Sequence, residues 1–367
     1  MEKPPSPRYA RGDLLDDVRE ASAAALAEAG RSPQGGARVW LDVAAASTWF
    51  FGSYLVLLLV PLSPAALALA IGSAGLALTA GLTHVVHPTI HGAVARNRRT
   101  NLILAHVLCP FGVSWRWWAL KHNAGHHGYV NVDGYDPDLD QGVFFRYCST
   151  QPRRTWHRYQ HLYAWPVYSL LTLRFILSSD LGFVLTGRFK GRQVEPASAR
   201  RAARVLLDKL GGATVLLVIA FVLHPALDVV LVTVALLLVN GLSTVLVFVP
   251  SHCTEGSAGV VPDTDGRVPE EWAASVVGAS NNLILSNPVL RWYVGGMDRH
   301  IEHHLLPRVA NVNLPVIAPA VRRVCAEHGL HYTEFPTLRS AWASHYRRLR
   351  ALGRAGEPEA AGLPIVA

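Results

Sequence analysis

Charged residues are scarce in this sequence. Asp, Glu, Lys and Arg make up 16% of its 367 residues, whereas hydrophobic residues make up 50%. Soluble domains usually carry about 25% charged residues. The deficit argues against an ordinary soluble domain and favours a chain in contact with lipid.

The motifs of secretion and of disulfide frameworks are also missing. The N-terminal residues MEKPPSPRYARGDLLDDVRE lack the basic and then apolar segments of a signal peptide, so none is expected. The four cysteines, Cys109, Cys148, Cys253 and Cys325, show no C-x-x-C spacing. We expect reduced, mostly buried thiols in a cytosolic environment.

No long segment alternates between apolar and polar residues, and the predicted fold class is therefore all-α. A helix is predicted at residues 14–29, and amphipathic helices are predicted between Asn313 and Gly329 and between Thr337 and Gly353. The formal net charge of +8 favours a membrane surface or an acidic partner over nucleic acid, because the hydrophobic fraction is so high.

Four long apolar runs are present, at residues 43–60, 64–83, 212–223 and 227–249. A membrane-spanning helix needs about 20 mostly apolar residues. The third run reaches this length when residues 205–210 are included. We therefore predict an integral membrane protein with four transmembrane helices, paired as two hairpins at about residues 43–83 and 205–249.

The distribution of basic residues predicts the orientation. The turns at residues 61–63 and 224–226 contain no Lys or Arg, whereas residues 84–211 are rich in both. By the positive-inside rule, both termini and the remaining segments lie in the cytoplasm as a helical cap. The alternative is a large soluble helical protein with buried hairpins.

The predicted organisation has three parts. Residues 1–36 form a cytosolic N-terminal helix and linker, residues 37–353 form the membrane domain, and residues 354–367 form a disordered tail.

Histidines are abundant, with 17 in the chain, and several gather where the topology places them on the cytoplasmic side. Nine of them have spacings that suit metal ligation: His87, His91, His122, His126, His127, His252, His300, His303 and His304. Neighbours four apart share a helix face, whereas adjacent residues diverge by about 100°. The pairs His126–His127 and His303–His304 can therefore each serve two neighbouring ions.

Nine imidazoles are too many for one metal ion and suit two. Neutral imidazole suits Zn, Cu, Fe and Ni alike, so the ligand set alone leaves the metal open. A single H-x-x-x-H is more often a surface or satisfied core pair, and it is the combination of clusters that indicates a metal site. His157 and His161 have helical spacing too, but their basic and aromatic surroundings favour an interfacial helix.

Three of these segments carry a resemblance to a known family. The sequences HPTIHG at 87–92, KHNAGHHGYVNVDGYDPDLD at 121–140 and HIEHHLLP at 300–307 resemble the histidine boxes of membrane-bound di-iron fatty acid desaturases, in the acyl-lipid and acyl-CoA branch. The resemblance covers roughly residues 40–350, in the order and membrane spacing of that family.

The resemblance implies an O2-dependent oxidoreductase of lipid metabolism. Two irons, held by the nine histidines, would be the catalytic centre, with O2 as co-substrate. Two vicinal hydrogens would leave an unactivated fatty acyl chain, giving a C=C bond and water. The protein would position one methylene pair and exclude water from the oxidant.

Further site residues are expected around the metals. Asn131, Asp136, Asp138 and Glu302 are candidates for orienting the histidines, with Asp140 completing a D-x-D-x-D run that lacks the Gly and Glu of a calcium loop. Trp115, Trp117 and Trp118 are candidates for an apolar substrate tunnel. The alternative for these tryptophans is an interfacial aromatic belt.

Each turnover would need two external electrons. No G-x-G-x-x-G follows a strand and no H-P-G-G haem motif occurs, so bound NAD, flavin or haem is not expected. The implied partners are a separate ferredoxin- or cytochrome-like donor, membrane lipid, and an acyl substrate on CoA, a carrier protein or a lipid.

Two rival interpretations remain. The same scaffold could hydroxylate, epoxidise or form an acetylene on a hydrophobic or acyl substrate. The second rival is a non-catalytic membrane metal-binding protein. Such a protein is expected to carry polar residues within its membrane spans, and these four apolar runs carry few.

Overall fold

The computed structural model describes residues 7–107, 114–139, 143–179, 188–189, 192–193 and 198–354. The chain divides into two compact units. Unit 1 comprises Met1–Gly35, Lys121–Ala164 and Val247–Ala367, and unit 2 comprises Gly36–Leu120 and Trp165–Leu246. Cys109, Asp140 and the predicted tail from residue 355 onward lie outside the described residues.

Helices dominate both units, which confirms the predicted helical class. The strands are only two to five residues long and pair two at a time. Such short pairs have no alternating pattern to detect, which is why the sequence does not predict them.

Unit 2 contains the apolar helices. Its main elements are α2 (Ala37–Leu59), α3 (Pro64–Gly81), η1 (Leu82–Val86), α4 (His87–Ile90), α5 (Arg98–Val107), α6 (Trp115–Ala119), α8 (Leu171–Arg174), η4 (Phe175–Ser179), α10 (Ala199–Leu223), the greater part of α11 (Ala226–Phe248), and the antiparallel pair β2 (Arg188–Phe189) and β3 (Arg192–Gln193). The boundary between the units falls inside α7 (Gln160–Ser169) and at η2 (Leu120–His126).

Three helical stretches of the described residues are long and apolar enough to cross a membrane: Ala37–Leu59, Pro64–Ile90 and Ala226–Ser251. They correspond to the first, second and fourth predicted spans. The third predicted run lies in α10, a continuous 25-residue helix that is not among those three.

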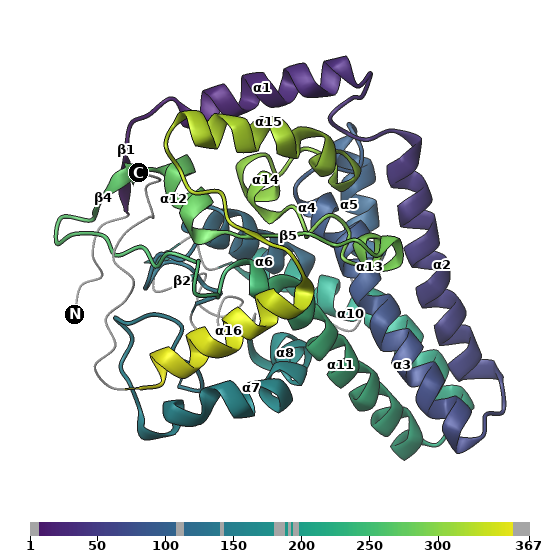
Figure 1. The fold of residues 1–367 in the computed structure, drawn as a ribbon. Helices are drawn as coiled ribbons and strands as arrows, with labels where there is room; N and C mark the ends of the chain where they lie inside the picture. Colours follow the sequence, from purple (N-terminus) through teal and green to yellow (C-terminus); the bar gives the residue numbers. More distant parts are fainter. Residues whose placement is uncertain are drawn as a thin grey trace. The chain divides into compact units, whose positions relative to one another are not determined.

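Helices α2 and α3, at the residues of the first predicted hairpin, lie side by side (Figure 1). The turn between them ends at Ser63, whose side chain accepts a hydrogen bond from the main-chain N–H of Ala66. Pro64 then occupies the first turn of α3, where its missing N–H costs nothing.

Close packing joins α3 to α11. A Cβ on Gly75 would lie 2.7 Å from the Val239 side chain, so only glycine permits this approach. Thr79 accepts a hydrogen bond from Asn240 Nδ2 at 2.9 Å, and its hydroxyl lies 2.5 Å from that of Ser243. Small and hydroxyl-bearing residues at a helix contact are typical of packing in lipid.

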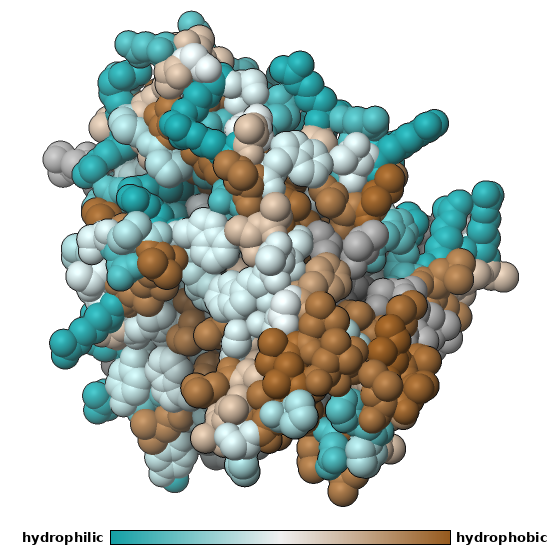
Figure 2. Space-filling view, turned by 90° about the vertical axis from the view of Figure 1, so that its right-hand side faces the viewer, coloured by the Kyte–Doolittle hydropathy of each residue, from teal (hydrophilic) through white to brown (hydrophobic). Residues whose placement is uncertain are grey.

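The outward faces of these helices carry many large apolar side chains. Leu41 on α2 is 69% exposed, Leu69 on α3 is 76% exposed and Val222 on α10 is 76% exposed. Hydrophobic residues gather over the lower right of the face shown in Figure 2. Exposed apolar surface on this scale indicates contact with lipid or another apolar partner.

Unit 1 contains shorter elements around a separate core. They are β1 (Arg8–Ala10), α1 (Leu14–Glu28), η3 (Thr155–Tyr159), η5 (Val249–Ser251), β4 (Arg267–Glu271), α12 (Trp272–Ala279), β5 (Asn282–Leu283), α13 (Pro288–Tyr293), α14 (His300–Leu305), η6 (Asn311–Asn313), α15 (Leu314–Glu327), β6 (Glu334–Phe335) and α16 (Leu338–Leu352). The strands β1 and β4 pair in parallel, as do β5 and β6.

The core of unit 1 fixes the short helix α14. Helix α1 lies along α15 (Figure 1), and Leu14 and Ile317 are buried between them. Ile301 and Leu305 of α14 belong to the same cluster. The burial of Ile301 and Leu305 in this core fixes the rotation of α14 about its axis, so that its histidines point away from the core cluster.

Candidate metal centre

Four histidines of unit 1 bring their side-chain nitrogens to one point, and we call them the four-histidine group. The group consists of His126, His252, His300 and His304. The Nε2 atom of His252 lies 3.2 Å from that of His126, 2.8 Å from that of His300 and 3.0 Å from that of His304. These residues come from η2, from the residue after η5, and from α14.

The other ring nitrogen of two members has a fixed acceptor. His126 Nδ1 lies 3.1 Å from both carboxylate oxygens of Asp136, and His252 Nδ1 lies 3.2 Å from the carbonyl oxygen of Ala279. A nitrogen that faces an acceptor carries the proton in neutral imidazole. The Nε2 atoms of His126 and His252 therefore present lone pairs to each other.

This arrangement fits a metal ion. A neutral imidazole nitrogen has either one proton or one lone pair, so His252 Nε2 cannot form hydrogen bonds with three nitrogens at once. Ligand nitrogens at right angles, about 2.1 Å from a metal, lie about 3.0 Å apart. The observed separations of 2.8–3.2 Å match that spacing.

Burial favours the neutral, metal-binding form of these side chains. Burial, followed by the neighbouring His126, lowers the pKa of His252 to about 3. Burial and the surrounding histidines also lower the pKa of His304. For His126, burial acts in the same direction, but the carboxylates of Asp136 and Asp138 outweigh it and raise the pKa. Metal binding requires deprotonated ligands, so His252 and His304 are poised for it at neutral pH.

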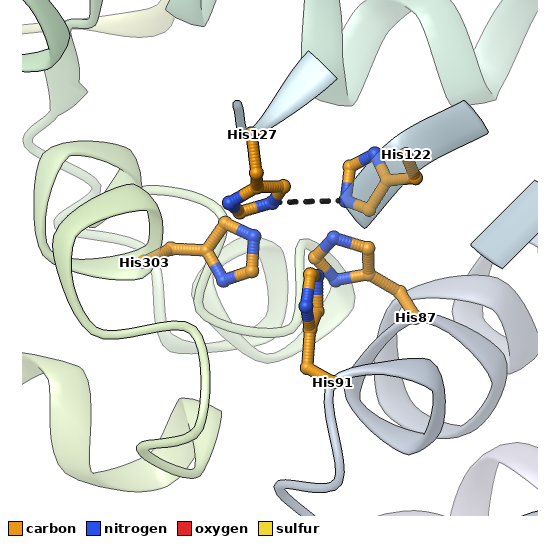
Figure 3. A group of neighbouring side chains, drawn as sticks. All are labelled: His87, His91, His122, His127 and His303. Carbon is orange, nitrogen blue, oxygen red and sulfur yellow. Dashed lines mark hydrogen bonds between the residues drawn. The ribbon is translucent and has the colours of Figure 1, made fainter. Parts of the chain in front are cut away.

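Three further histidines of unit 1, His122, His127 and His303, lie beside this group. Figure 3 shows how these three lie relative to one another. His127 Nε2 is 3.1 Å from His122 Nε2, and the rings of His127 and His303 have centroids 4.9 Å apart. The His127 ring also stacks on His304 at 4.2 Å. The two adjacent pairs, His126–His127 and His303–His304, are thus each divided between two sets of histidines.

The helix that carries His122 and His126 is a π-helix and not an α-helix. Helical spacing paired His122 with His126, but η2 is a π-helix and His127 N–H donates to the carbonyl oxygen of His122, five residues back, at 2.8 Å. His122 Nε2 therefore meets His127 Nε2, and His122 also stays close to His126, with which it stacks at 5.4 Å and forms a further group together with Asp138. Single π-helical turns recur at functional sites.

In unit 2, His87 and His91 lie at the end of the second apolar stretch. Their ring centroids are 4.9 Å apart, and both are drawn in Figure 3. A π-helical segment, η1, immediately precedes His87. The ring of Trp118, a predicted tunnel residue, lies 5.9 Å from the His87 ring.

Of the acidic residues predicted to orient histidines, Asp136 and Asp138 lie next to His126, whereas Glu302 bonds to other residues. Asp136 accepts from His126, and also from the main-chain N–H of Asn131 at 2.9 Å. Asp138 pairs with Lys121 and lies 3.5 Å from His126 Nδ1. Glu302 is fully buried, and its carboxylate accepts hydrogen bonds from Asn282 and Tyr332.

Asn131 connects the second histidine box to the segment of His252. Its side-chain amide donates to the carbonyl oxygens of His252 at 2.9 Å, Ala258 at 3.1 Å and Ala279 at 3.3 Å. Its φ angle of 54° is in the left-handed region, the only such non-glycine residue among those described. Asn tolerates this conformation better than most residues.

The other two predicted tunnel tryptophans are buried in unit 2. Trp115 is 9% exposed and Trp117 is 4% exposed. Arg116 stacks over the Trp115 ring, and Trp117 packs against Phe175 with centroids 5.9 Å apart.

Several site residues had no signal in the sequence. The carbonyl oxygen of Ala279 sets the tautomer of His252, and Asn281, Asn282 and Tyr332 contact the ligand-bearing segments. None belongs to a histidine box, and each reaches the site only through the fold. The dipeptide Asn281-Asn282, in an otherwise apolar stretch, was the one available hint.

Comparisons with known proteins agree with the geometry. Residues 61–336 match the family described as Fatty acid desaturase. The chain is 26% identical to the sn-1 linoleoyl-lipid 6-desaturase of Synechocystis sp., over 90% of this chain and 92% of that protein. It is 27% identical to the enzyme of the same name from Arthrospira platensis, over 73% of each chain. It is 30% identical to the acyl-lipid (8-3)-desaturase of Physcomitrium patens, over 73% of this chain and 57% of that protein. The chain thus belongs to the fatty acid desaturase family and is an oxidoreductase that desaturates a fatty acyl chain.

Proposed function

We propose that this desaturase acts on the acyl chain of a membrane lipid, with two irons and O2. The observation that carries the metal assignment is the convergence of three imidazole nitrogens, from His126, His300 and His304, on His252 Nε2, each 2.8–3.2 Å from it. The lipid substrate is suggested by the relatives, whose names specify lipid-linked acyl chains. The apolar surfaces of the three long helices suit such a substrate.

The two irons take different ligand sets in this proposal. One is held by the four-histidine group. The other is held by His122, His127 and His303 of unit 1, and the nine-histidine assignment made from the sequence adds His87 and His91 to the iron ligands. Each adjacent histidine pair contributes one member to each iron, which keeps the two ions close together. Imidazole is a suitable ligand for iron.

The bound irons would supply an O2-derived oxidant that can remove hydrogen from an unactivated C–H bond. The chain's own residues fix the ligands around it. Asp136 holds the proton of His126 on Nδ1, and the Ala279 carbonyl does the same for His252, so both Nε2 atoms face the metal position. Oriented ligands of this kind bind metal more tightly.

The electron balance requires a partner. Reduction of O2 to two waters takes four electrons, and the two hydrogens removed from the acyl chain supply two. A separate ferredoxin- or cytochrome-like protein supplies the other two. In this proposal α10 is the third of four membrane spans, and both termini, the histidines and the donor are on the cytoplasmic side.

Expression in a bacterium, with mass spectrometry of its membrane lipids, tests the proposal. We expect a new acyl species two mass units lighter than its precursor, absent with His304→Ala and retained with His331→Ala, an exposed histidine outside the site. A product with one added oxygen indicates hydroxylation or epoxidation on the same scaffold. An unchanged product from His304→Ala contradicts the metal assignment.

A further inference from the structure

Two adjacent asparagines, Asn281 and Asn282, lie at the start of β5 with 0% exposure. Neither belongs to a histidine box, and most buried side-chain amides in folded proteins make hydrogen bonds. Side chains of neighbouring residues in extended chain point to opposite sides. The two amides accordingly serve two different segments of unit 1.

Asn281 holds the segment that carries His252. Its Nδ2 lies 2.9 Å from Thr254 Oγ1 and 2.7 Å from Ser257 Oγ, and 3.4 Å from the carbonyl oxygen of Ser251. Its main-chain N–H donates to that same carbonyl at 2.8 Å. The contacts lie on both sides of His252 in the chain, so they fix the path of the backbone through this ligand.

Asn282 holds α14, which carries His300 and His304. Its Oδ1 accepts from the main-chain N–H of Ile301 at 2.9 Å, and its Nδ2 donates to Glu302 Oε2 at 2.9 Å. The helix has only six residues, so it has little intrinsic stability and depends on tertiary contacts for its position.

The side chain of Glu302 completes this contact. Tyr332 donates its hydroxyl to Glu302 Oε1, and Asn282 Nδ2 lies 2.6 Å from the Tyr332 hydroxyl oxygen. Burial raises the pKa of Glu302, and the two donors oppose that effect. The orientation of the Asn282 amide has no alternative, because its oxygen is already used by the N–H of Ile301.

We propose that Asn281 and Asn282 form one positioning element that sets the distance between His252 and the two α14 ligands, His300 and His304. Asn281 fixes the first segment and Asn282, through Glu302, fixes the second. Because the two asparagines are covalently adjacent, the Nε2 atoms are held at the 2.8 and 3.0 Å separations that a shared metal needs. The inference rests on the proposed metal ligation by the four-histidine group.

Exchanging the donor and the acceptor tests this role. In Glu302→Gln, the new side-chain amide places a donor opposite the amide donor of Asn282. In Asn282→Asp, the new carboxylate faces the carboxylate of Glu302. Each single variant therefore loses the hydrogen bond between these two side chains. The double variant Asn282→Asp/Glu302→Gln restores one donor and one acceptor, and one oxygen of the new carboxylate still accepts from Ile301 N–H. Asn287→Asp, at an exposed helix cap where Asp serves equally well, is the matched control.

Iron per chain and the Mössbauer spectrum are measured on the full-length protein purified in detergent and loaded with iron. We expect both single variants to lose the iron of the four-histidine group and its spectral component, and the double variant to regain both. The control keeps the wild-type values. A merely structural role would lower stability without this selective loss or its rescue. Single variants with wild-type iron and spectra, or a folded double variant as deficient as the singles, overturn the inference.

A variant that fails to fold is replaced by Tyr332→Phe, which removes only one hydroxyl. We expect an altered spectrum of the same iron component, and a wild-type spectrum overturns the inference. The iron content of the wild-type protein distinguishes a failure of the proposed function from a failure of the positioning role. If it binds no iron, the proposed function fails, whereas a wild-type protein with two irons and unaffected variants refutes the positioning role alone.

Discussion

His252 and His300 lie 48 residues apart in the chain, yet their Nε2 atoms are 2.8 Å from each other. His252 directly follows a helix long and apolar enough to cross a membrane, and His300 begins the short buried helix α14. Two ligands from such different elements meet only if their backbones are held independently of the metal. The contacts of Asn131, Asn281 and Asn282 do this.

Removal of the Asp136 carboxylate should weaken metal binding. Asp136→Ala deprives His126 of the acceptor for its Nδ1 proton, so the imidazole can rotate or change tautomer. We expect metal affinity to fall by about 10- to 100-fold, and Asp136→Asn, which keeps one acceptor oxygen, to be intermediate. Titration of the metal-free protein with Fe²⁺ under anaerobic conditions measures this. Equal affinities for the wild type and Asp136→Ala would show that Asp136 does not orient His126.

Substitution of Asn131 separates hydrogen bonding from backbone strain. Asn131→Gly and Asn131→Ala both lose three hydrogen bonds, but only alanine is strained at a φ of 54°. We expect the alanine variant to be less stable than the glycine variant by about 1 kcal/mol. Thermal unfolding midpoints in detergent check the order. An alanine variant at least as stable as the glycine variant contradicts the positive φ angle.

Close helix contact in unit 2 predicts sensitivity at Gly241. An added Cβ there would lie 2.2 Å from the main-chain oxygen of Ser169, whereas a Cβ on Gly52 meets nothing within 4 Å. We expect Gly241→Ala to destabilise the protein by about 1–3 kcal/mol, with no loss for Gly52→Ala. The two variants are compared by thermal unfolding in the same detergent. Equal midpoints would mean that α11 and Ser169 are not in contact.

The pH dependence of stability should include a contribution from His345. This buried residue of α16 lies with its Nδ1 2.6 Å from the carbonyl oxygen of Cys253, and burial lowers its pKa to about 4. An unfolded histidine titrates near 6.5, so the unfolded state binds more protons between about pH 6.5 and 4. Its contribution to stability is therefore complete above this window and is lost as the pH falls through it.

The variant His345→Gln lacks this titration. The free energy of unfolding of the wild type, relative to the variant, should fall by on the order of 2–3 kcal/mol between pH 7 and pH 4. Thermal or urea unfolding of both metal-free proteins across this range measures the difference. Parallel pH profiles would show that His345 is not buried in its neutral form.

Features that depend on neighbouring residues could be predicted from the sequence, whereas features that depend on long-range contacts could not. The bounds of α15 and α16 agree with the predictions because Gly329 and the Thr337–Ser340 capping box are local signals. The nine histidines were singled out by spacing and topology. The additional contact of His122 with His127 was not predictable, because it depends on a π-helical turn that the sequence does not signal.

The supporting contacts depend on long-range packing. Asn281 and Tyr332 are far in sequence from the histidines they affect, and an asparagine in a loop usually has a solvent or turn role. Glu302 was predicted to orient a histidine, and its hydrogen bonds go to Asn282 and Tyr332. Only the folded chain shows that a carboxylate beside three histidines turns away from them.

The metal content of the purified wild-type protein tests the central claim most directly. Inductively coupled plasma mass spectrometry, with protein quantified by amino-acid analysis, gives the metal identity and number per chain. The account predicts two irons per chain, because the pairs His126–His127 and His303–His304 each give one member to the four-histidine group and leave the other for a second ion. A protein that holds zinc, or one ion per chain, contradicts it.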